Sequence, residues 1–204
     1  MAADYKAVAN FANASPSIGS TAVIPQASIW RVRTFRSNNA TSKMLALMLA
    51  HQQPVDLLTG QRIDIGKSLA WNNDKEFHHL FPRAYVKKNS TIDANSLANI
   101  AMLTSASNIS ISAKAPSGYL DQLRKRIGDD EFYRRLELSL VPREAVEAAL
   151  HDNFDQFLQL RSEVLQHTAM ALIGANTQGA PELVESSALA QDYQDDEDED
   201  LVDE

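Results

Sequence analysis

Residues 76–85 read EFHHLFPRAY, and residues 95–108 read NSLANIAMLTSASN. In extended backbone the side chains of His78 and His79 point to opposite faces, so one imidazole can face a metal ion while the other faces a substrate. On a helix, two histidines would instead need a spacing of four to share one metal ion. An isolated His-His pair is most often a pair of polar surface residues, so the second stretch is what makes this pair a candidate site.

Two asparagines follow the histidine pair in order. Asn99 lies 20 residues after His79, and Asn108 lies nine residues after Asn99. This ordered set resembles the HNH, or ββα-metal, nuclease motif. In that family an acid or a His followed by a His ends the first strand. An Asn precedes the second strand, and a His or Asn lies nine residues later in a helix.

A closer resemblance covers about residues 28–135. The stretches HHLFPRAY, NSLANI and KAPSGYL (residues 114–120) are similar to the C-terminal nuclease domain of GmrSD-like restriction proteins. Each motif alone is weak, and the ordered set with matching spacing is specific. Those relatives usually carry an N-terminal ParB-like nucleotidase domain, for which this chain has no room. We therefore expect a stand-alone nuclease unit, an excised domain, or one subunit of a split system.

The resemblance implies a role for each matching residue. His78 and Asn108 would ligate one divalent cation, Mg²⁺ or Mn²⁺, with water and a phosphate oxygen completing the shell. His79 would be the general base that deprotonates the attacking water, and Asn99 would brace the loop that aims His79. The candidate nucleic-acid contacts are Lys114, Arg83, Lys87, Lys88 and Arg124.

Two positions depart from the commonest form of the motif. His78 stands where many HNH enzymes have Asp, and Asn108 stands where many have His. The pair leaves the metal without a carboxylate, so a hard cation would be held weakly and with help from the substrate phosphate. Glu76 or Asp74 is a further candidate acid, although a solvated side chain is the commoner fate of such a residue.

The charge is unevenly distributed along the chain. The sequence has 27 acidic and 19 basic residues and a formal net charge of −8. Eleven of the acids and none of the bases lie in residues 182–204, which leaves 16 acids against 19 bases, a net of about +3, in the rest of the chain. A mildly basic body suits a nucleic-acid partner, whereas the acidic segment is expected to be disordered.

The expected fold class is α+β, mostly helical, with a ββα-metal finger embedded between N-terminal and C-terminal helices. We expect an N-terminal helical extension in residues 1–27, the nuclease domain in residues 28–180 and the acidic tail in residues 181–204. The strand-rich insert is expected near residues 74–104. The chain has no cysteine, which excludes disulfides and thiolate zinc sites.

Helices are predicted from apolar spacing and capping residues. One is expected over residues 1–14, and one over residues 43–50 with Thr41 or Ser42 as its N-cap. Beyond Asn108 four more are expected: one over residues 119–127, one opened by residues 129–131, one begun by Pro142, and a long one capped by Asp152. The apolar stripe of the long helix comprises Phe154, Phe157, Leu158, Leu165 and Leu172.

These observations favour a metal-dependent DNA endonuclease with little intrinsic sequence specificity, acting in restriction or anti-phage defence. The expected location is the cytoplasm of a bacterial or phage-infected cell, with DNA as partner, no membrane association, and a homodimer or a specificity or nucleotidase subunit as options. One alternative is an inactive HNH-like module that binds DNA or a partner. Another is a helical interaction protein whose acidic tail is the functional part.

Overall fold

The computed structural model describes residues 24–69, 76–174 and 183–184. The helix predicted in residues 1–14 and most of the predicted tail lie outside the described residues. The elements in chain order are β1 (Ile24–Pro25), α2 (Ala27–Val32), α3 (Ala40–His51), α4 (Ile65–Ser68), β2 (Phe77–His79), α5 (Arg83–Asn89), the 3₁₀ helix η2 (Leu97–Asn99), β3 (Ile100–Met102), α6 (Ser105–Ile111), α7 (Pro116–Ile127), α8 (Asp129–Glu137), α9 (Arg143–Leu150), α10 (Phe154–Gly174) and β4 (Leu183–Val184).

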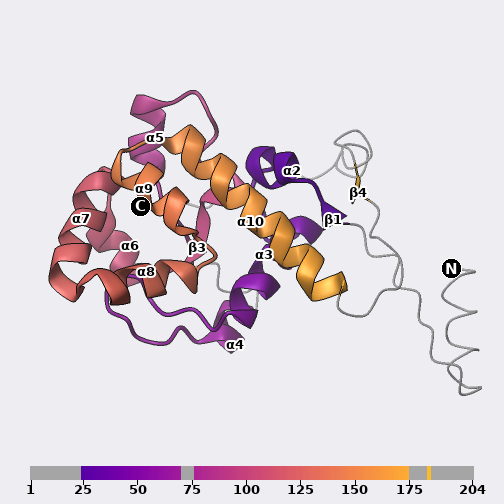
Figure 1. Ribbon diagram of the computed structural model, residues 1–204, viewed down its shortest axis with the longest axis horizontal. Helices are drawn as coiled ribbons and strands as arrows, with labels where there is room; N and C mark the ends of the chain where they lie inside the picture. Colours follow the sequence, from indigo (N-terminus) through magenta and orange to yellow (C-terminus); the bar gives the residue numbers. More distant parts are fainter. Residues whose placement is uncertain (1–23, 70–75, 175–182, 185–204) are drawn as a thin grey trace, which may run out of the picture.

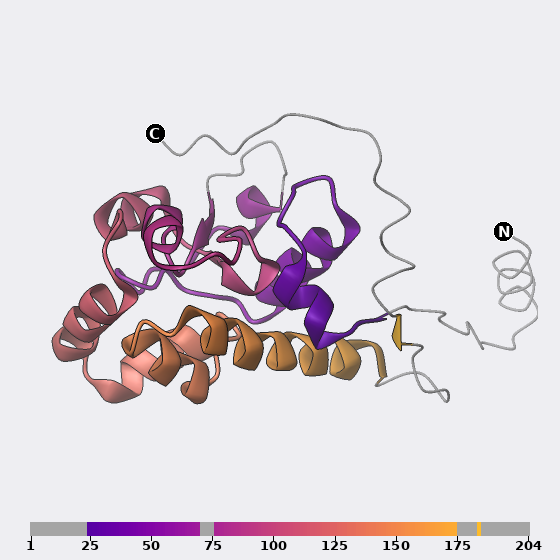
Figure 2. The ribbon, with the colours of Figure 1, turned by 90° about the horizontal axis from the view of Figure 1, so that it is seen from above.

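The α+β, mostly helical class predicted from the sequence is confirmed. β2 and β3 pair in antiparallel fashion, with His78 opposite Ala101, and β1 pairs with β4 in parallel. The long helix α10 crosses the front of the molecule (Figure 1). Seen from above, α10 runs along one side and packs against α2, α9 and η2 (Figure 2).

One continuous apolar core joins the two halves of the chain. Phe81, which follows the histidine pair, is fully buried, and its ring centroid lies 4.9 Å from those of both Phe154 and Phe157 on α10. Phe35 packs against Phe77 of β2 at 5.2 Å. Offset aromatic pairs at these distances add to the free energy gained from burying apolar surface. The segment carrying the histidines is therefore held between the N-terminal segment and α10.

The helices that follow Asn108 form where the sequence predicts them. α7 begins at Pro116, a residue suited to the first turn because it has no backbone N–H to satisfy. Its Leu120 and Leu123 are buried as predicted. α8 has three acidic residues in its first turn, where their negative charge interacts favourably with the positive end of the helix dipole. Pro142 immediately precedes α9.

Two predicted caps are wrong. α3 begins at Ala40, and its N-cap is Asn39, whose Oδ1 accepts hydrogen bonds from the backbone N–H groups of Thr41 and Ser42. Asp152 does not cap α10 because its carboxylate instead accepts from the N–H and Oγ of Ser117, at 2.9 and 2.7 Å. A half-buried link to α7 thus took precedence over local capping.

Two further expectations need correction. Leu172 is 44% exposed, because it lies near the end of α10, beyond the buried stripe. The segment between β2 and β3 is also less strand-rich than predicted, since it contains the helix α5 and the 3₁₀ helix η2. In the described part of residues 74–104, the strand residues are limited to 77–79 in β2 and 100–102 in β3.

Candidate functional site

The four motif residues fall on a strand–strand–helix unit. His78 and His79 end β2, Asn99 ends η2 immediately before β3, and Asn108 lies in the second turn of α6. Thr104 caps α6 by accepting the N–H of Ser107 on its Oγ1. Both histidines are half-buried. The order strand, Asn, strand, helix is thus the arrangement that the resemblance implies.

Asn99 is fully buried, and its side chain holds the loop that follows His79. Its Oδ1 accepts the N–H of Phe81 at 2.8 Å. Its Nδ2 donates to the carbonyl oxygens of Phe81 and Ala94, at 2.9 and 2.8 Å. Because an Asn amide offers both donors and an acceptor, this one side chain satisfies both polar groups of the Phe81 backbone.

The backbone of Leu80 is fixed in the same way. Its N–H donates to the backbone oxygen of Asn99 at 2.9 Å, and its carbonyl oxygen accepts the Tyr119 hydroxyl at 2.7 Å. Tyr119 is buried, and burial with the nearby Asp152 raises the pKa of its phenol, so it stays a donor. Each polar backbone group of the two residues after His79 therefore has a partner.

A buried arginine, which the sequence interpretation missed, stabilises the backbone on both sides of Asn99. Arg161 of α10 is fully buried and donates to the carbonyl oxygens of Ala98 and Ile100, both at 2.8 Å, and of Ser139 at 2.9 Å. Ala98 and Ile100 are the immediate neighbours of Asn99. Burial lowers the pKa of Arg161 to about 9, so the guanidinium is still charged at neutral pH.

The ring of His79 has a side-chain partner in the loop between α5 and η2. Its Nε2 lies 2.7 Å from Oδ1 of Asn95. Asn95 is itself held at both ends of its backbone, since its N–H donates to Asp93 Oδ1 at 2.9 Å and its carbonyl oxygen accepts the N–H of Phe35 at 2.8 Å. The imidazole therefore faces an acceptor whose position is fixed.

Asp56 joins the 56–61 turn to the start of α6. Its fully buried carboxylate accepts from Thr104 N and Oγ1 at 2.8 and 2.9 Å, from Ser107 Oγ at 2.7 Å, and from Thr59 N and Oγ1 at 2.8 and 2.9 Å. Burial alone would raise the pKa of Asp56, but the hydrogen bonds from Ser107, Thr104 and Thr59 outweigh it and hold the pKa below its ordinary value. The carboxylate also complements the positive end of α6, the helix that carries Asn108.

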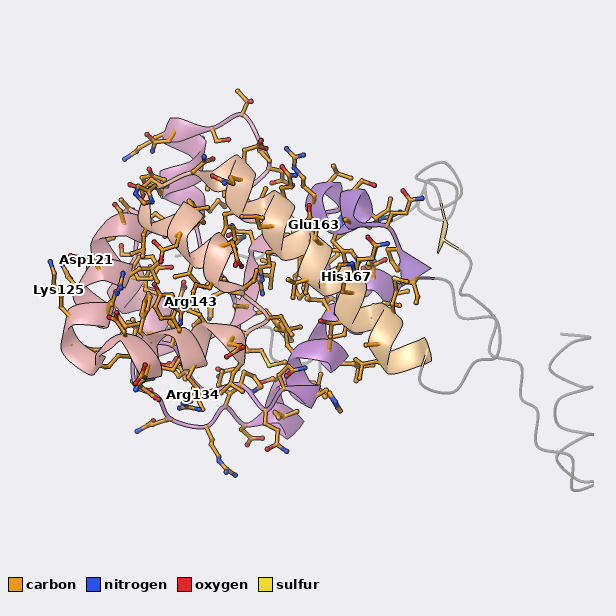
Figure 3. All side chains as sticks on the ribbon, viewed as in Figure 1. Asp121, Lys125, Arg134, Arg143, Glu163 and His167 are labelled. Carbon is orange, nitrogen blue, oxygen red and sulfur yellow. The ribbon has the colours of Figure 1, made fainter. Side chains whose placement is uncertain are left out.

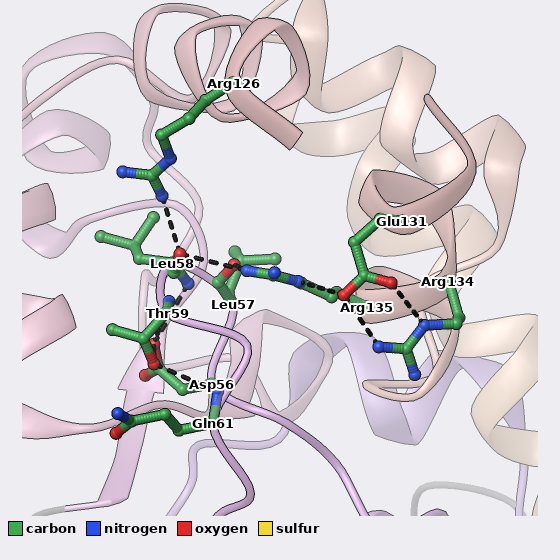
Figure 4. Close-up of polar contacts among 9 residues, drawn as sticks. All are labelled: Asp56, Leu57, Leu58, Thr59, Gln61, Arg126, Glu131, Arg134 and Arg135. Atoms are coloured by element: carbon green, nitrogen blue, oxygen red, sulfur yellow. Dashed lines mark hydrogen bonds and ion pairs between the residues drawn. The ribbon is translucent and has the colours of Figure 1, made fainter. Parts of the chain in front are cut away.

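Basic side chains on α7 and α8 are engaged within the protein. Arg124 forms two hydrogen bonds with Asp129, at 2.9 and 2.8 Å. Lys125 pairs with Asp121 on the outer surface of α7 (Figure 3). Figure 4 shows the guanidinium of Arg126 directed at the carbonyl oxygen of Leu58, which Arg135 also contacts. The predicted DNA contact Arg124 would therefore have to exchange a bidentate ion pair for a phosphate.

The basic side chains of α5 have different surroundings. Arg83, Lys87 and Lys88 are all exposed, and α5 contains no acid. Within residues 24–69 and 76–174 none of the three forms an ion pair. α5 also begins four residues after His79. Lys114, the remaining predicted contact, is exposed and donates to the carbonyl oxygen of Ser110 at 2.7 Å.

The candidate metal ligands are two neutral donors. Asn108 is half-buried, and its side chain has no hydrogen-bond partner among the described residues. In that part of the chain no cluster of three or more His, Asp or Glu side chains is placed to hold a metal ion. An imidazole and an amide oxygen fit a cation that keeps most of its shell for water and phosphate oxygens. Asp74 lies outside the described residues.

Comparisons with protein-family models, with curated proteins and with solved structures found no match to this chain. Across the described residues, no helix combines the length and the apolar character needed to cross a bilayer.

Proposed function

We propose that this chain is a metal-dependent HNH endonuclease that hydrolyses DNA phosphodiester bonds. The observation that carries the proposal is the fixed loop behind His79, in which Asn99 satisfies both polar groups of the Phe81 backbone. A general base contributes only when its ring is held in place relative to the water that it deprotonates. Such a fixed half-buried histidine suits that task.

The proposed roles are those that the resemblance to HNH nucleases implies, and the fixed loop after His79 supports the first of them. His79 accepts the proton of the attacking water, a step for which a positioned imidazole contributes on the order of 10²–10⁴ in rate. Asn99 positions the loop without touching the substrate. His78 and Asn108 would hold the divalent cation, Mg²⁺ or Mn²⁺, which when bound supplies charge stabilisation at the scissile phosphate.

We further propose that DNA is held along α5. Its exposed cations, Arg83, Lys87 and Lys88, have no described acid as a partner and follow His79 closely in the chain. Contacts with phosphates give affinity without sequence preference. Sequence or modification specificity would then come from a partner subunit or domain, which agrees with a role in restriction or anti-phage defence in the cytoplasm of a bacterial or phage-infected cell.

Cleavage of supercoiled plasmid by the wild-type chain tests the proposal. We expect nicked or linear product with Mg²⁺ or Mn²⁺ and none with excess EDTA. Binding of the same DNA, measured by fluorescence anisotropy, separates the alternative function. A chain that binds DNA but yields no product with any of several divalent metals is a binding module, which the lack of a carboxylate among the candidate ligands would then explain.

The salt dependence of binding tests the role of α5. Each phosphate contact contributes about 0.9 to the slope of log K against log salt concentration. We expect the Lys87→Gln/Lys88→Gln double variant to lower this slope by up to about 2. The control variant Lys125→Gln/Arg134→Gln makes the same change in net charge at side chains that already pair with Asp121 and Glu131, and equal effects of the two variants would contradict the assignment.

A further inference from the structure

We propose that Asn95 is a positioning residue for His79, which fixes its ring and its tautomer. The inference rests on the proposed nuclease function for its catalytic consequence. The contact itself, 2.7 Å between His79 Nε2 and Asn95 Oδ1, is a feature of the folded chain. An amide oxygen can only accept a hydrogen bond, so this contact selects the imidazole that carries its proton on Nε2.

The selected tautomer is the one that a base in this position needs. A neutral imidazole has one N–H and one lone pair, and the hydrogen bond made by one nitrogen determines the state of the other. With the proton of His79 on Nε2 and directed at Asn95, the lone pair is on Nδ1. Under the proposed function Nδ1 would be the nitrogen that accepts the proton of the attacking water, while Nε2 would keep its hydrogen bond to Asn95.

The surroundings of Asn95 show why it can impose an orientation. Its N–H donates to Asp93 Oδ1, and Asp93 Oδ2 accepts the hydroxyl of Thr34 at 3.0 Å. Its carbonyl oxygen accepts the N–H of Phe35, a buried residue packed on β2. The backbone of Asn95 is therefore hydrogen-bonded to Phe35, whose ring packs against Phe77 of the strand that carries His79.

The two asparagines of the NSLAN stretch, Asn95 and Asn99, have different structural roles. Among the described residues, the hydrogen bonds of the Asn99 side chain go to the backbone of Phe81 and Ala94. The side chain of Asn95 hydrogen-bonds to the His79 ring instead. Loss of Asn99 should therefore weaken the fold, whereas loss of Asn95 should alter the catalytic base in a chain that stays folded.

The test compares Asn95→Leu, which has no acceptor, with Asn95→Asp, which keeps one. The first measurement is the ¹⁵N spectrum of the histidine side chains in the full chain without metal or DNA, with the His79 signals identified by their loss in His79→Gln. We expect the Nε2–H form in wild type and in Asn95→Asp, and a shift toward the Nδ1–H form in Asn95→Leu. A predominantly Nδ1–H ring in wild type would overturn the proposal.

The second measurement is the single-turnover cleavage rate beside the affinity for DNA. We expect Asn95→Leu to lose roughly 10- to 10³-fold in rate with DNA affinity within twofold of wild type, and Asn95→Asp to lose much less. Equal rates for the two variants would overturn a role through the tautomer. If the wild-type chain does not cut at all, the proposed nuclease function fails, and the ¹⁵N spectrum still decides whether Asn95 sets the tautomer.

Discussion

Replacing Asn99 by Asp tests whether the buried amide holds the loop after His79. The change keeps the size of the side chain and the acceptor for the Phe81 N–H. It removes both donors of Nδ2 and directs a carboxylate oxygen at the carbonyl oxygens of Phe81 and Ala94. Each buried carbonyl left without a donor costs roughly 1–3 kcal/mol. We therefore expect Asn99→Asp to lose about 2–6 kcal/mol of unfolding free energy at pH 7, with the buried charge adding to the loss.

The pH dependence of this loss follows from the same contacts. Burial beside two carbonyl oxygens disfavours the charged form, so the pKa of the introduced carboxyl is raised in the folded state. The defect is full above that raised pKa and shrinks as the pH falls below it, because the protonated carboxyl regains one O–H donor. Stability relative to wild type should thus be worse at pH 8 than at pH 5.

Urea unfolding followed by circular dichroism measures both effects. Asn108→Asp is the matched control, because the Asn108 side chain is half-buried and makes no hydrogen bond among the described residues. We expect that control to stay within about 0.5 kcal/mol of wild type. An Asn99→Asp variant that lost less than about 1 kcal/mol at pH 8 would refute the reasoning.

Three further changes test the supports of the site. Asp56→Asn should lose about 2 kcal/mol of stability at pH 7. Because the pKa of the Asp56 carboxyl is depressed in the folded state, its contribution is complete above the ordinary value of 3.8 and is lost as the pH falls below it. The difference in unfolding free energy between Asp56→Asn and wild type, measured by urea unfolding, should therefore narrow below about pH 4. A constant difference down to pH 3 would contradict a stabilising role for the ionised Asp56 carboxylate. Gly60→Ala should destabilise by more than about 1 kcal/mol, since Gly60 has a φ of +73° and an added Cβ would lie 2.5 Å from Arg135 Nη2. Gly118→Ala in α7, where nothing lies within 4 Å of the added atom, should instead stabilise slightly. Equal melting temperatures for the two glycine variants would contradict the close packing of Arg135 against Gly60. Arg161→Lys should lower stability by about 2 kcal/mol or more, because one ammonium group cannot reproduce the spread of a guanidinium over four carbonyl oxygens, and an unchanged thermal midpoint would show that those contacts matter little.

The sequence predicted the local frame of the site well. The resemblance implied a histidine pair at the end of one strand, an Asn before a second strand and a helix carrying Asn108, and the structure has each of these elements. α5 was missed because residues 83–89 follow a proline-containing loop and contain little apolar periodicity. α5 forms with Val86 buried on its inner side, which is a tertiary effect.

The supports of the site depend on contacts between distant residues. Arg161 reaches carbonyl oxygens 61 and 63 residues away in the chain, and Asp56 reaches α6 across 48 or more. One signal for Arg161 was present, because it shares the helical spacing of Phe154, Leu158 and Leu165 and so falls on the buried face. Nothing local in the sequence distinguishes Asn95, whose partner depends on how its loop folds against β2.

The most direct test of the central claim is the single-turnover rate of plasmid cleavage by His79→Ala beside wild type, at equal DNA binding and with Mg²⁺ or Mn²⁺. His167→Ala, which removes an imidazole from the exposed surface of α10 (Figure 3), is the matched control. The proposed role of His79 as the general base predicts a rate lower by roughly 10²–10⁴ for His79→Ala and an unchanged rate for His167→Ala. A folded His79→Ala variant that cuts as fast as wild type would contradict it.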